Sequence, residues 1–453
     1  MREYRRCRIG DDSSRILWAI ADQCAVSGGN FFTNLILIRT LVPAEFGTYA
    51  LFLNAINFFN TIHQAFIAYP LCVRGARARA GQFQRILTFA LIATTLVILM
   101  PLGPVLSIVG VYLNQSTVIL AAVSAMLFWQ LQNTLRAGFI AKLEQRRALA
   151  GDAISYIGQA VLLGLICIRT RPSLSVIFWA VAGTSLLALA VQCRQMRPAR
   201  PPRRTLRPLA HEFWFLGRWN VVAQLVGFLT LQAFPWLILM RHGRVEVAGF
   251  QAILLFLTLT NPLLFSAGNL ITATVAKHGN YRFPSVRNYL LLVIGAVGPY
   301  LLLLGFAGPY LMGMLYGRHS HYLAYAPLMR IFAAAWLFEV IALMTTAILG
   351  GLRDPRSIFF LQLSGAAAAV LIALPWIYWK GLIVAGFAML LVNVVRSGAG
   401  IYLLLRRRSN TRRGGGLNVL DTADIGIGRE STELPVLATT YLGSVLEEAY
   451  ANL

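Results

Sequence analysis

Long apolar runs recur along the chain from residue 16 to residue 404. Each run has about twenty residues, the length that an α-helix needs to cross a hydrocarbon core of roughly 30 Å. A helix also satisfies its own backbone hydrogen bonds inside lipid. The pattern predicts an all-α polytopic membrane protein with about twelve transmembrane helices. The predicted spans are 16–38, 46–69, 86–108, 117–136, 153–168, 174–193, 213–240, 247–266, 289–316, 323–349, 358–379 and 382–404.

The composition agrees with a lipid environment. Of the 453 residues, 57% are hydrophobic and 13% are charged, and the mean hydropathy is +0.65. A soluble domain of this size would carry more charge. The first span is not expected to be a cleaved signal peptide, because it is too long, contains Asp22, Asn30 and Asn34, and leads into further spans.

The distribution of basic residues predicts the topology. A net charge of +23 could suggest nucleic acid as a partner, but the arginines and lysines cluster at alternate ends of the spans. Loops rich in basic residues face the cytoplasm in membrane proteins. We therefore expect no nucleic acid partner, and we expect both chain ends to lie in the cytoplasm.

The longest polar interruption between spans divides them six and six. It runs over 194–212 and is rich in proline and arginine, which is typical of a linker. Arg39 and Gly47 recur as Arg241 and Gly249 at the same spacing, which weakly favours an internal repeat. The sequence predicts a cytoplasmic N-terminus (1–15), a six-helix lobe (16–193), the linker, a second six-helix lobe (213–404) and a polar, disordered tail (405–453).

Enzyme motifs are missing from the sequence. It contains no Gly-rich phosphate loop, no HExxH and no GxSxG. Its five cysteines show no metal-ligand spacing, and a disulfide framework is not expected. We therefore expect no catalytic residue, no metal and no cofactor, and we place the function in the membrane region itself.

The second span carries a polar stripe. Asn54, Asn57, Thr61 and Gln64 fall on one helix face at i, i+3, i+7 and i+10. Such a stripe forms either hydrogen bonds between helices or the wall of a wet cavity that could meet sugar hydroxyls. Asn30 and Asn34 in the first span carry the same two interpretations.

Few charges are embedded in the predicted spans: Asp22, Arg218, Arg330, Glu339 and Arg396. Arg330 and Glu339 are nine residues apart and so lie on opposite faces of one helix. Glu339 can instead pair with Arg396, because both are expected toward the cytoplasmic half. Two arginines at outer span ends, Arg39 and Arg241, either extend to the interface or face a cavity.

Several segments resemble one family of transporters. They are the stretch NLILIRTLVPAEFGTYA (34–50), the basic turn at 351–353, and the final helix from 381 to its basic end at 406–408. These segments look like the polysaccharide-biosynthesis flippases, the O-antigen and exopolysaccharide branch of the superfamily that also contains multidrug and toxic-compound extrusion (MATE) transporters. Arg39 and Gly47 match this pattern directly, and Arg241 follows through the internal repeat.

The resemblance implies a two-lobed bundle in the bacterial inner membrane whose central cavity opens alternately to cytoplasm and periplasm. The implied cargo is a polyprenyl-diphosphate-linked oligosaccharide, with membrane lipid, a polysaccharide polymerase or export machinery as further partners. We expect Arg218 to receive the diphosphate and Asp22 to pair with it when the cytoplasmic mouth is shut. The candidate cavity residues are Arg218, Asp22, Asn30, Asn34, Arg39, Asn54, Asn57, Thr61, Gln64, Arg241, Arg330 and Arg396.

Other functions remain open at this point. An ion-coupled exporter of drugs or small cations is the main alternative, although it would be expected to place carboxylates in its cavity. A facilitator-type sugar transporter lacks its acidic and glycine signature between 74 and 85. A membrane glycosyltransferase or polymerase would need a large external loop with catalytic groups, and the external loops are short.

Overall fold

The computed structural model describes residues 2–413, apart from residues 113, 115, 143, 279–283 and 353. All regular structure in this part of the chain is helical. Each of the twelve predicted spans coincides with a helix or with helices joined end to end, so the predicted all-α fold class is confirmed. The predicted disordered tail began at 405, but residues 405–413 continue helix α17, so this boundary was wrong; the rest of the tail, from 414 onward, lies outside the described residues.

The first half of the chain forms six spans, several of which are interrupted. The second span contains one turn of π-helix, η1, and the fifth span contains another, η3. Pro43 opens the second span at a position where a missing N–H costs nothing. The elements are α1 (Arg2–Thr40), α2 (Pro43–His63), η1 (Gln64–Ala68), α3 (Tyr69–Arg77), α4 (Ala80–Tyr112), η2 (Ser116–Val118), α5 (Ile119–Ala141), α6 (Gln145–Asp152), η3 (Ala153–Ile157), α7 (Gly158–Arg169) and α8 (Leu174–Met196).

The second half forms six further spans. The predicted linker is shorter than expected, because α9 begins within it, and only Arg197–Pro202 separates the helices. The elements are α9 (Arg203–Leu231), α10 (Phe234–His242), α11 (Arg244–Thr258), α12 (Asn261–His278), α13 (Pro284–Tyr316), η4 (His321–Leu328), α14 (Met329–Gly351), α15 (Pro355–Ala368), η5 (Ala369–Ala373), α16 (Leu374–Lys380) and α17 (Leu382–Arg413).

Length and hydropathy alone select fewer spans than the fold contains. Within the described residues, seven helical stretches are long and apolar enough to cross a membrane, and the bent pair α11–α12 raises the number to eight. Helices such as α1 and α5 carry buried amides and charges, including Asn30, Asn34, Asn133 and Arg136. Such groups are tolerated in a span when they face other helices instead of lipid.

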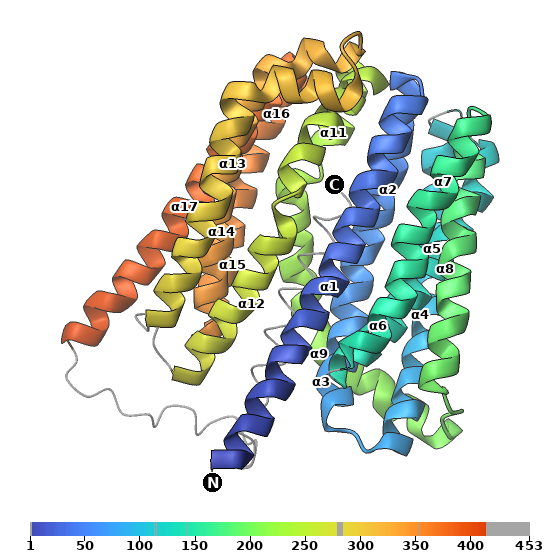
Figure 1. The fold of residues 1–453 in the computed structure, drawn as a ribbon, viewed down its shortest axis with the longest axis vertical. Helices are drawn as coiled ribbons and strands as arrows, with labels where there is room; N and C mark the ends of the chain where they lie inside the picture. The colour runs from blue at the N-terminus through green and yellow to red at the C-terminus, as the bar shows by residue number, and fades with distance from the viewer. Residues whose placement is uncertain are drawn as a thin grey trace.

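The helices pack into two bundles that lie side by side. Figure 1 shows α4, α5, α7 and α8 on one side and α13, α14, α16 and α17 on the other, with α1, α2, α11 and α12 between them. In the first bundle α5 packs on α4 and α8, and α1 on α6, η3 and α7. In the second, α14 packs on α12, α13 and α17. Helix α9 follows the linker but contacts η1 and α3 as well as α15, so it touches both bundles.

The bundles meet closely where α2 begins. Gly47 lies so near the backbone carbonyl of Arg244 on α11 that a Cβ atom there would overlap it. The Phe46 ring meets the Tyr322 ring edge-on at 6.4 Å. On the preceding helix, α1, Arg39 donates from Nε to the carbonyl of Leu315 on α13 at 2.6 Å. Glycine at position 47 therefore allows a direct contact between the bundles at the end of the molecule opposite the N-terminus.

Candidate functional site

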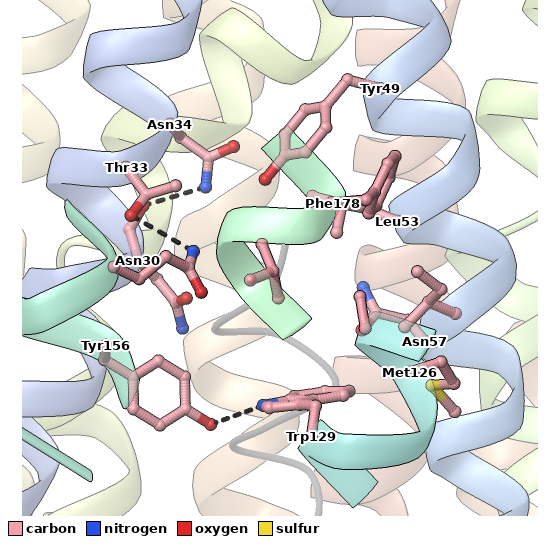
Figure 2. Close-up of a pocket in the computed structure, with 14 residues that line it drawn as sticks. Asn30, Thr33, Asn34, Tyr49, Leu53, Asn57, Met126, Trp129, Tyr156 and Phe178 are labelled. Carbon is pink, nitrogen blue, oxygen red and sulfur yellow. Dashed lines mark hydrogen bonds between the residues drawn. The ribbon is translucent and has the colours of Figure 1, made fainter. Parts of the chain in front are cut away.

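A small polar cavity, with about 50 Å³ of room for the centres of water molecules, lies inside the first bundle (Figure 2). Side chains from α1, α2, α5, η3, α7 and α8 form its wall. Amides, hydroxyls and aromatic rings supply the polar groups, and none of the lining residues is charged. The lining residues are Asn30, Thr33, Asn34, Tyr49, Leu53, Ile56, Asn57, Ala125, Met126, Trp129, Tyr156, Gln159, Phe178 and Val181.

Hydrogen bonds fix part of this wall and leave part of it available. Gln159 donates to the Thr33 hydroxyl at 3.4 Å, and the Trp129 indole N–H donates to the Tyr156 hydroxyl at 3.0 Å, as Figure 2 shows. Asn34 donates to the backbone carbonyl of Asn30 at 3.0 Å. The Nδ2 of Asn30 and the Oδ1 of Asn34 are buried and have no hydrogen-bond partner among the described residues. The cavity wall thus holds one donor and one acceptor that a bound polar molecule could satisfy.

The residues of the predicted polar stripe on the second span have three different roles. Asn57 lines the cavity. Asn54 instead donates to Gln232 and accepts from the Trp236 indole N–H, both in the second bundle. Thr61 donates to the carbonyl of Asn57 at 2.9 Å. One residue of this helix face thus forms hydrogen bonds between helices, another lines a cavity, and a third bonds within its own helix; contact with sugar hydroxyls stays a prediction.

Gln64, the last residue of the predicted stripe, lies at the start of η1. It donates to Asn60 Oδ1 at 3.4 Å, and Gln130 on α5 donates to the same oxygen at 2.9 Å. Gln64 is 3% exposed and does not line the cavity. Both of these hydrogen bonds to Asn60 lie within the first bundle.

A second cavity, with about 310 Å³ of room for the centres of water molecules, separates α1 from the bend between α11 and α12. Asn30 and Asn34 line this space as well as the first cavity, so one face of α1 connects the two. The axes of α11 and α12 differ by 53° at the bend. Asn261, buried at this bend, has no hydrogen-bond partner for either side-chain atom among the described residues. The full lining is Cys24, Ser27, Gly28, Asn30, Phe31, Phe32, Asn34, Leu255, Thr258, Leu259 and Pro262.

Asp22 has a different partner from the predicted one. Its Oδ2 accepts from Arg136 at 2.9 Å, and Arg136 also lies 2.7 Å from Asp152. Arg218 is exposed and lies over the Phe215 ring at 5.0 Å. The Asp22–Arg218 pair was predicted for a state in which the cytoplasmic mouth is shut, so this pairing stays a prediction. In this structure the direction of each side chain around its helix gives the two residues different neighbours.

Arg136 and Asp152 are residues that the sequence interpretation missed. Arg136 was placed at the end of a span, among the cytoplasmic basic residues. In the structure α5 continues to Ala141, and Arg136 is 3% exposed in the interior. Gln132, one turn earlier on α5, donates to Asp152 at 3.1 Å. Polar residues at 132 and 136, four apart on one helix face, were the available signal.

The other predicted arginines lie away from both cavities. Arg39 binds carbonyls at the end of α13, Arg330 donates to the carbonyl of Gly305 at 3.1 Å, and Arg241 lies over the Tyr378 ring at 5.7 Å. All three are exposed. Arg396 is buried and forms an ion pair with Glu339, so the predicted pairing of these two residues is confirmed. No group of three or more potential metal ligands occurs in the described residues.

Comparison with known proteins gives structural matches only. No family model matches the sequence, and no curated protein matches it. An inward-facing multidrug resistance MATE family transporter of the MOP superfamily superposes with a TM-score of 0.65 at 14% identity, covering 88% of this chain and 100% of its own. The lipid II flippase MurJ, in an inward closed conformation, superposes with a TM-score of 0.70 at 10% identity, covering 96% of this chain and 98% of its own. The chain has the MATE-type transporter fold.

A third structure extends this comparison to archaea. A MOP superfamily transporter from Pyrococcus furiosus, described as having a binding pocket of reversed polarity, superposes with a TM-score of 0.62 at 12% identity. It covers 88% of this chain and 96% of its own. Proteins of this fold thus differ in the polarity of their pockets, so the residues of the pocket must decide the cargo.

Proposed function

We propose that this protein is a flippase that moves a polyprenyl-diphosphate-linked oligosaccharide from the cytoplasmic to the periplasmic leaflet of a bacterial inner membrane. The observation that carries the proposal is the uncharged polar wall shared by the two cavities, centred on Asn30 and Asn34. Amides and hydroxyls both donate and accept hydrogen bonds, as sugar hydroxyls do. The aromatic rings of Trp129 and Tyr156 add apolar faces with polar edges.

The superposition on MurJ supports the same class of cargo. That protein is named for flipping lipid II and covers nearly the whole of this chain. In the proposed cycle, the six-helix lobes 16–193 and 213–404 rock against each other. The contacts of Arg39 and Gly47 support a state that is closed at the outer end. The contact of Arg218 with the diphosphate stays a prediction, as does its pairing with Asp22 when the cytoplasmic mouth is shut; in that state Asp22 would have to leave Arg136.

An ion-coupled exporter of small cations is the competing function, because MATE transporters share this fold. Such an exporter needs negative charge where its cargo binds. Asp22 and Asp152 line neither cavity, and both lie against Arg136. The described geometry therefore favours a glycan over a cation.

Transport by proteoliposomes tests the proposal. The inner leaflet is loaded with a radiolabelled polyprenyl-diphosphate oligosaccharide, and its arrival outside is read by an impermeant glycosidase. We expect the wild type to transfer the lipid. Asn34→Leu should slow transfer by about tenfold, since one lost hydrogen bond of about 1.4 kcal/mol corresponds to that factor.

A matched variant controls for loss of an interior amide. Asn393→Leu removes an amide of the second bundle, which donates to the carbonyl of Ala335 and lines neither cavity. With folding checked by size exclusion, its transfer rate should stay near that of the wild type. If the wild type transfers no glycan and instead drives proton-coupled efflux of ethidium, the proposed flippase function is wrong and the exporter function takes its place.

A further inference from the structure

An apolar groove, with about 520 Å³ of room for the centres of water-sized molecules, runs along the outer side of α1, where this helix packs on η3 and α7. Only Cys24 among its lining residues has a polar side-chain atom. The exposed rim is formed by Phe32, Val161 and Leu165, which are 55%, 57% and 59% exposed. The lining residues are Cys24, Ala25, Gly28, Gly29, Phe32, Ile36, Ile157, Ala160, Val161, Gly164, Leu165 and Ile168.

Small residues create the groove. Gly29 lies against the backbone of Tyr156, where a Cβ atom would come within 2.6 Å, so α1 and η3 touch at this point. At Gly28 a Cβ atom would meet nothing within 4 Å, and at Gly164 it would meet only Ile36, at 3.5 Å. Glycine at 28 and 164 thus leaves space that a larger side chain would fill. The depression is a feature of this sequence and would close if either residue were bulky.

The groove is continuous with the cavity between the bundles. Cys24, Gly28 and Phe32 line both. These residues follow each other at intervals of four and so form one stripe along α1. On one side of the stripe lie the amides of Asn30 and Asn34, and on the other lies the apolar groove. A molecule that fills both sides needs a polar head and a long apolar chain.

We propose that this groove holds the polyprenyl chain of the cargo while the diphosphate and glycan occupy the cavity between α1 and the α11–α12 bend. This assignment rests on the proposed function. From Cys24 to Ile36 the groove is about 18 Å long at 1.5 Å per residue, more than half of a hydrocarbon core of roughly 30 Å. It extends toward the outer end of α1, so a head that enters from the cytoplasmic side has its chain directed across the bilayer.

The position of the junction favours a polyprenyl lipid over a bulk phospholipid. The groove meets the polar cavity around Gly28, near the middle of the predicted first span 16–38. A phospholipid keeps its head at the membrane surface, so its acyl chain could cover the groove but its head would not reach Asn30. A lipid whose head enters between the bundles places its chain at the groove directly.

Binding of undecaprenyl phosphate to the full-length protein in nanodiscs tests the groove without any glycan. Gly164→Leu fills the groove where the backbone has room, and we expect it to weaken binding by at least about tenfold. Gly183→Leu is the matched control. Gly183 lies exposed on α8 in the same bundle, a Cβ atom there meets nothing within 4 Å, whereas one at Gly164 meets only Ile36 at ordinary contact distance, and Gly183 lines neither cavity nor the groove.

Photocrosslinking of the unchanged protein gives a second, independent reading. A polyprenyl phosphate with a diazirine on its chain should label Val161 and Leu165, and excess phosphatidylglycerol should not prevent this labelling. The groove assignment is wrong if Gly164→Leu binds like Gly183→Leu, if labels spread evenly over lipid-facing helices, or if phosphatidylglycerol competes equally. The probe could label the groove while the protein transfers no glycan in proteoliposomes. That result would overturn the proposed flippase function, but the assignment of the groove as a binding site for the polyprenyl chain would still hold.

Discussion

The two bundles neutralise their buried charged side chains through different arrangements of ion pairs. In the first bundle two carboxylates, Asp22 and Asp152, share the guanidinium of Arg136, and the three residues come from α1, α6 and α5. In the second bundle one carboxylate, Glu339, meets one guanidinium, Arg396, between α14 and α17. The first cluster joins three spans, whereas the second joins two.

The bundles also differ in what surrounds these charges. The first bundle buries a network of amides and hydroxyls and contains the polar cavity. His63, for example, contacts the hydroxyls of Thr94 and Thr134 at 3.2 and 2.9 Å. On the helices that carry the second pair, Phe332, Trp336, Met389 and Val392 belong to the apolar core, while Asn393 and Ser397 are buried and donate to backbone carbonyls of the neighbouring helix. The comparison indicates that the polar interior of the first bundle surrounds a cavity, while the buried polar groups of the second bundle mainly join its own helices.

The largest effect is expected from Arg136→Met, which leaves two buried carboxylates without their shared cation. Removing one partner of a buried ion pair costs about 3–5 kcal/mol. We expect the free energy of unfolding, measured by titration with SDS in mixed micelles, to fall by at least that amount. Arg407→Met should change it by only about 0–1 kcal/mol, because the Arg407–Asp354 pair is partly exposed.

Second-site changes that restore the stability of Arg136→Met test whether the first bundle holds a three-residue cluster, unlike the two-residue pair of the second bundle. Asp22→Asn alone should restore only part of the stability, and Asp22→Asn together with Asp152→Asn should restore most of it. Full rescue by the single change would show that Asp152 does not depend on Arg136, and the comparison of a three-residue cluster with a pair would fail.

A smaller effect is expected where α1 touches η3. Gly29→Ala places a methyl group 2.6 Å from the backbone of Tyr156, which must shift. Overpacking of this kind costs about 1–3 kcal/mol. Gly28→Ala, one residue earlier, meets open space and should stabilise the helix by about 0.5–1 kcal/mol. Equal unfolding free energies for the two variants would show that the contact in the first bundle is not tight.

The smallest net effect is expected when the ion pair of the second bundle is replaced entirely. Glu339→Leu with Arg396→Met should leave the unfolding free energy unchanged or raise it, because uncharged residues of similar volume replace a buried pair at little cost. The side chain of Arg396 packs on Gly365, and the straight chain of methionine can occupy the same space. Arg396→Met alone should lose about 3–5 kcal/mol. If the double variant is as unstable as Arg396→Met alone, the second bundle depends on its buried charges as strongly as the first does. The proposed difference between the bundles would then be wrong.

Part of the candidate site could be predicted from the sequence. Asn30, Asn34 and Asn57 were expected at a cavity wall, and they line one. The aromatic side of the same wall, Trp129 and Tyr156, was not expected. Aromatic residues are common in apolar spans, and only their mutual hydrogen bond across α5 and η3 distinguishes these two.

The sequence by itself determined the helical class and the predicted spans, and it offered the Glu339–Arg396 pair as one possibility, which the structure confirmed. Hydropathy is a local property, and a lipid-spanning segment must be helical wherever it occurs. The tertiary structure alone decided that Asp22 meets Arg136 instead of Arg218, and that Arg39 binds the end of α13. It also decided that Asn54 joins the bundles while Asn57 faces a cavity. These outcomes depend on the rotation of each helix about its axis and on which helix packs against it, and neither is set by the local sequence of one span.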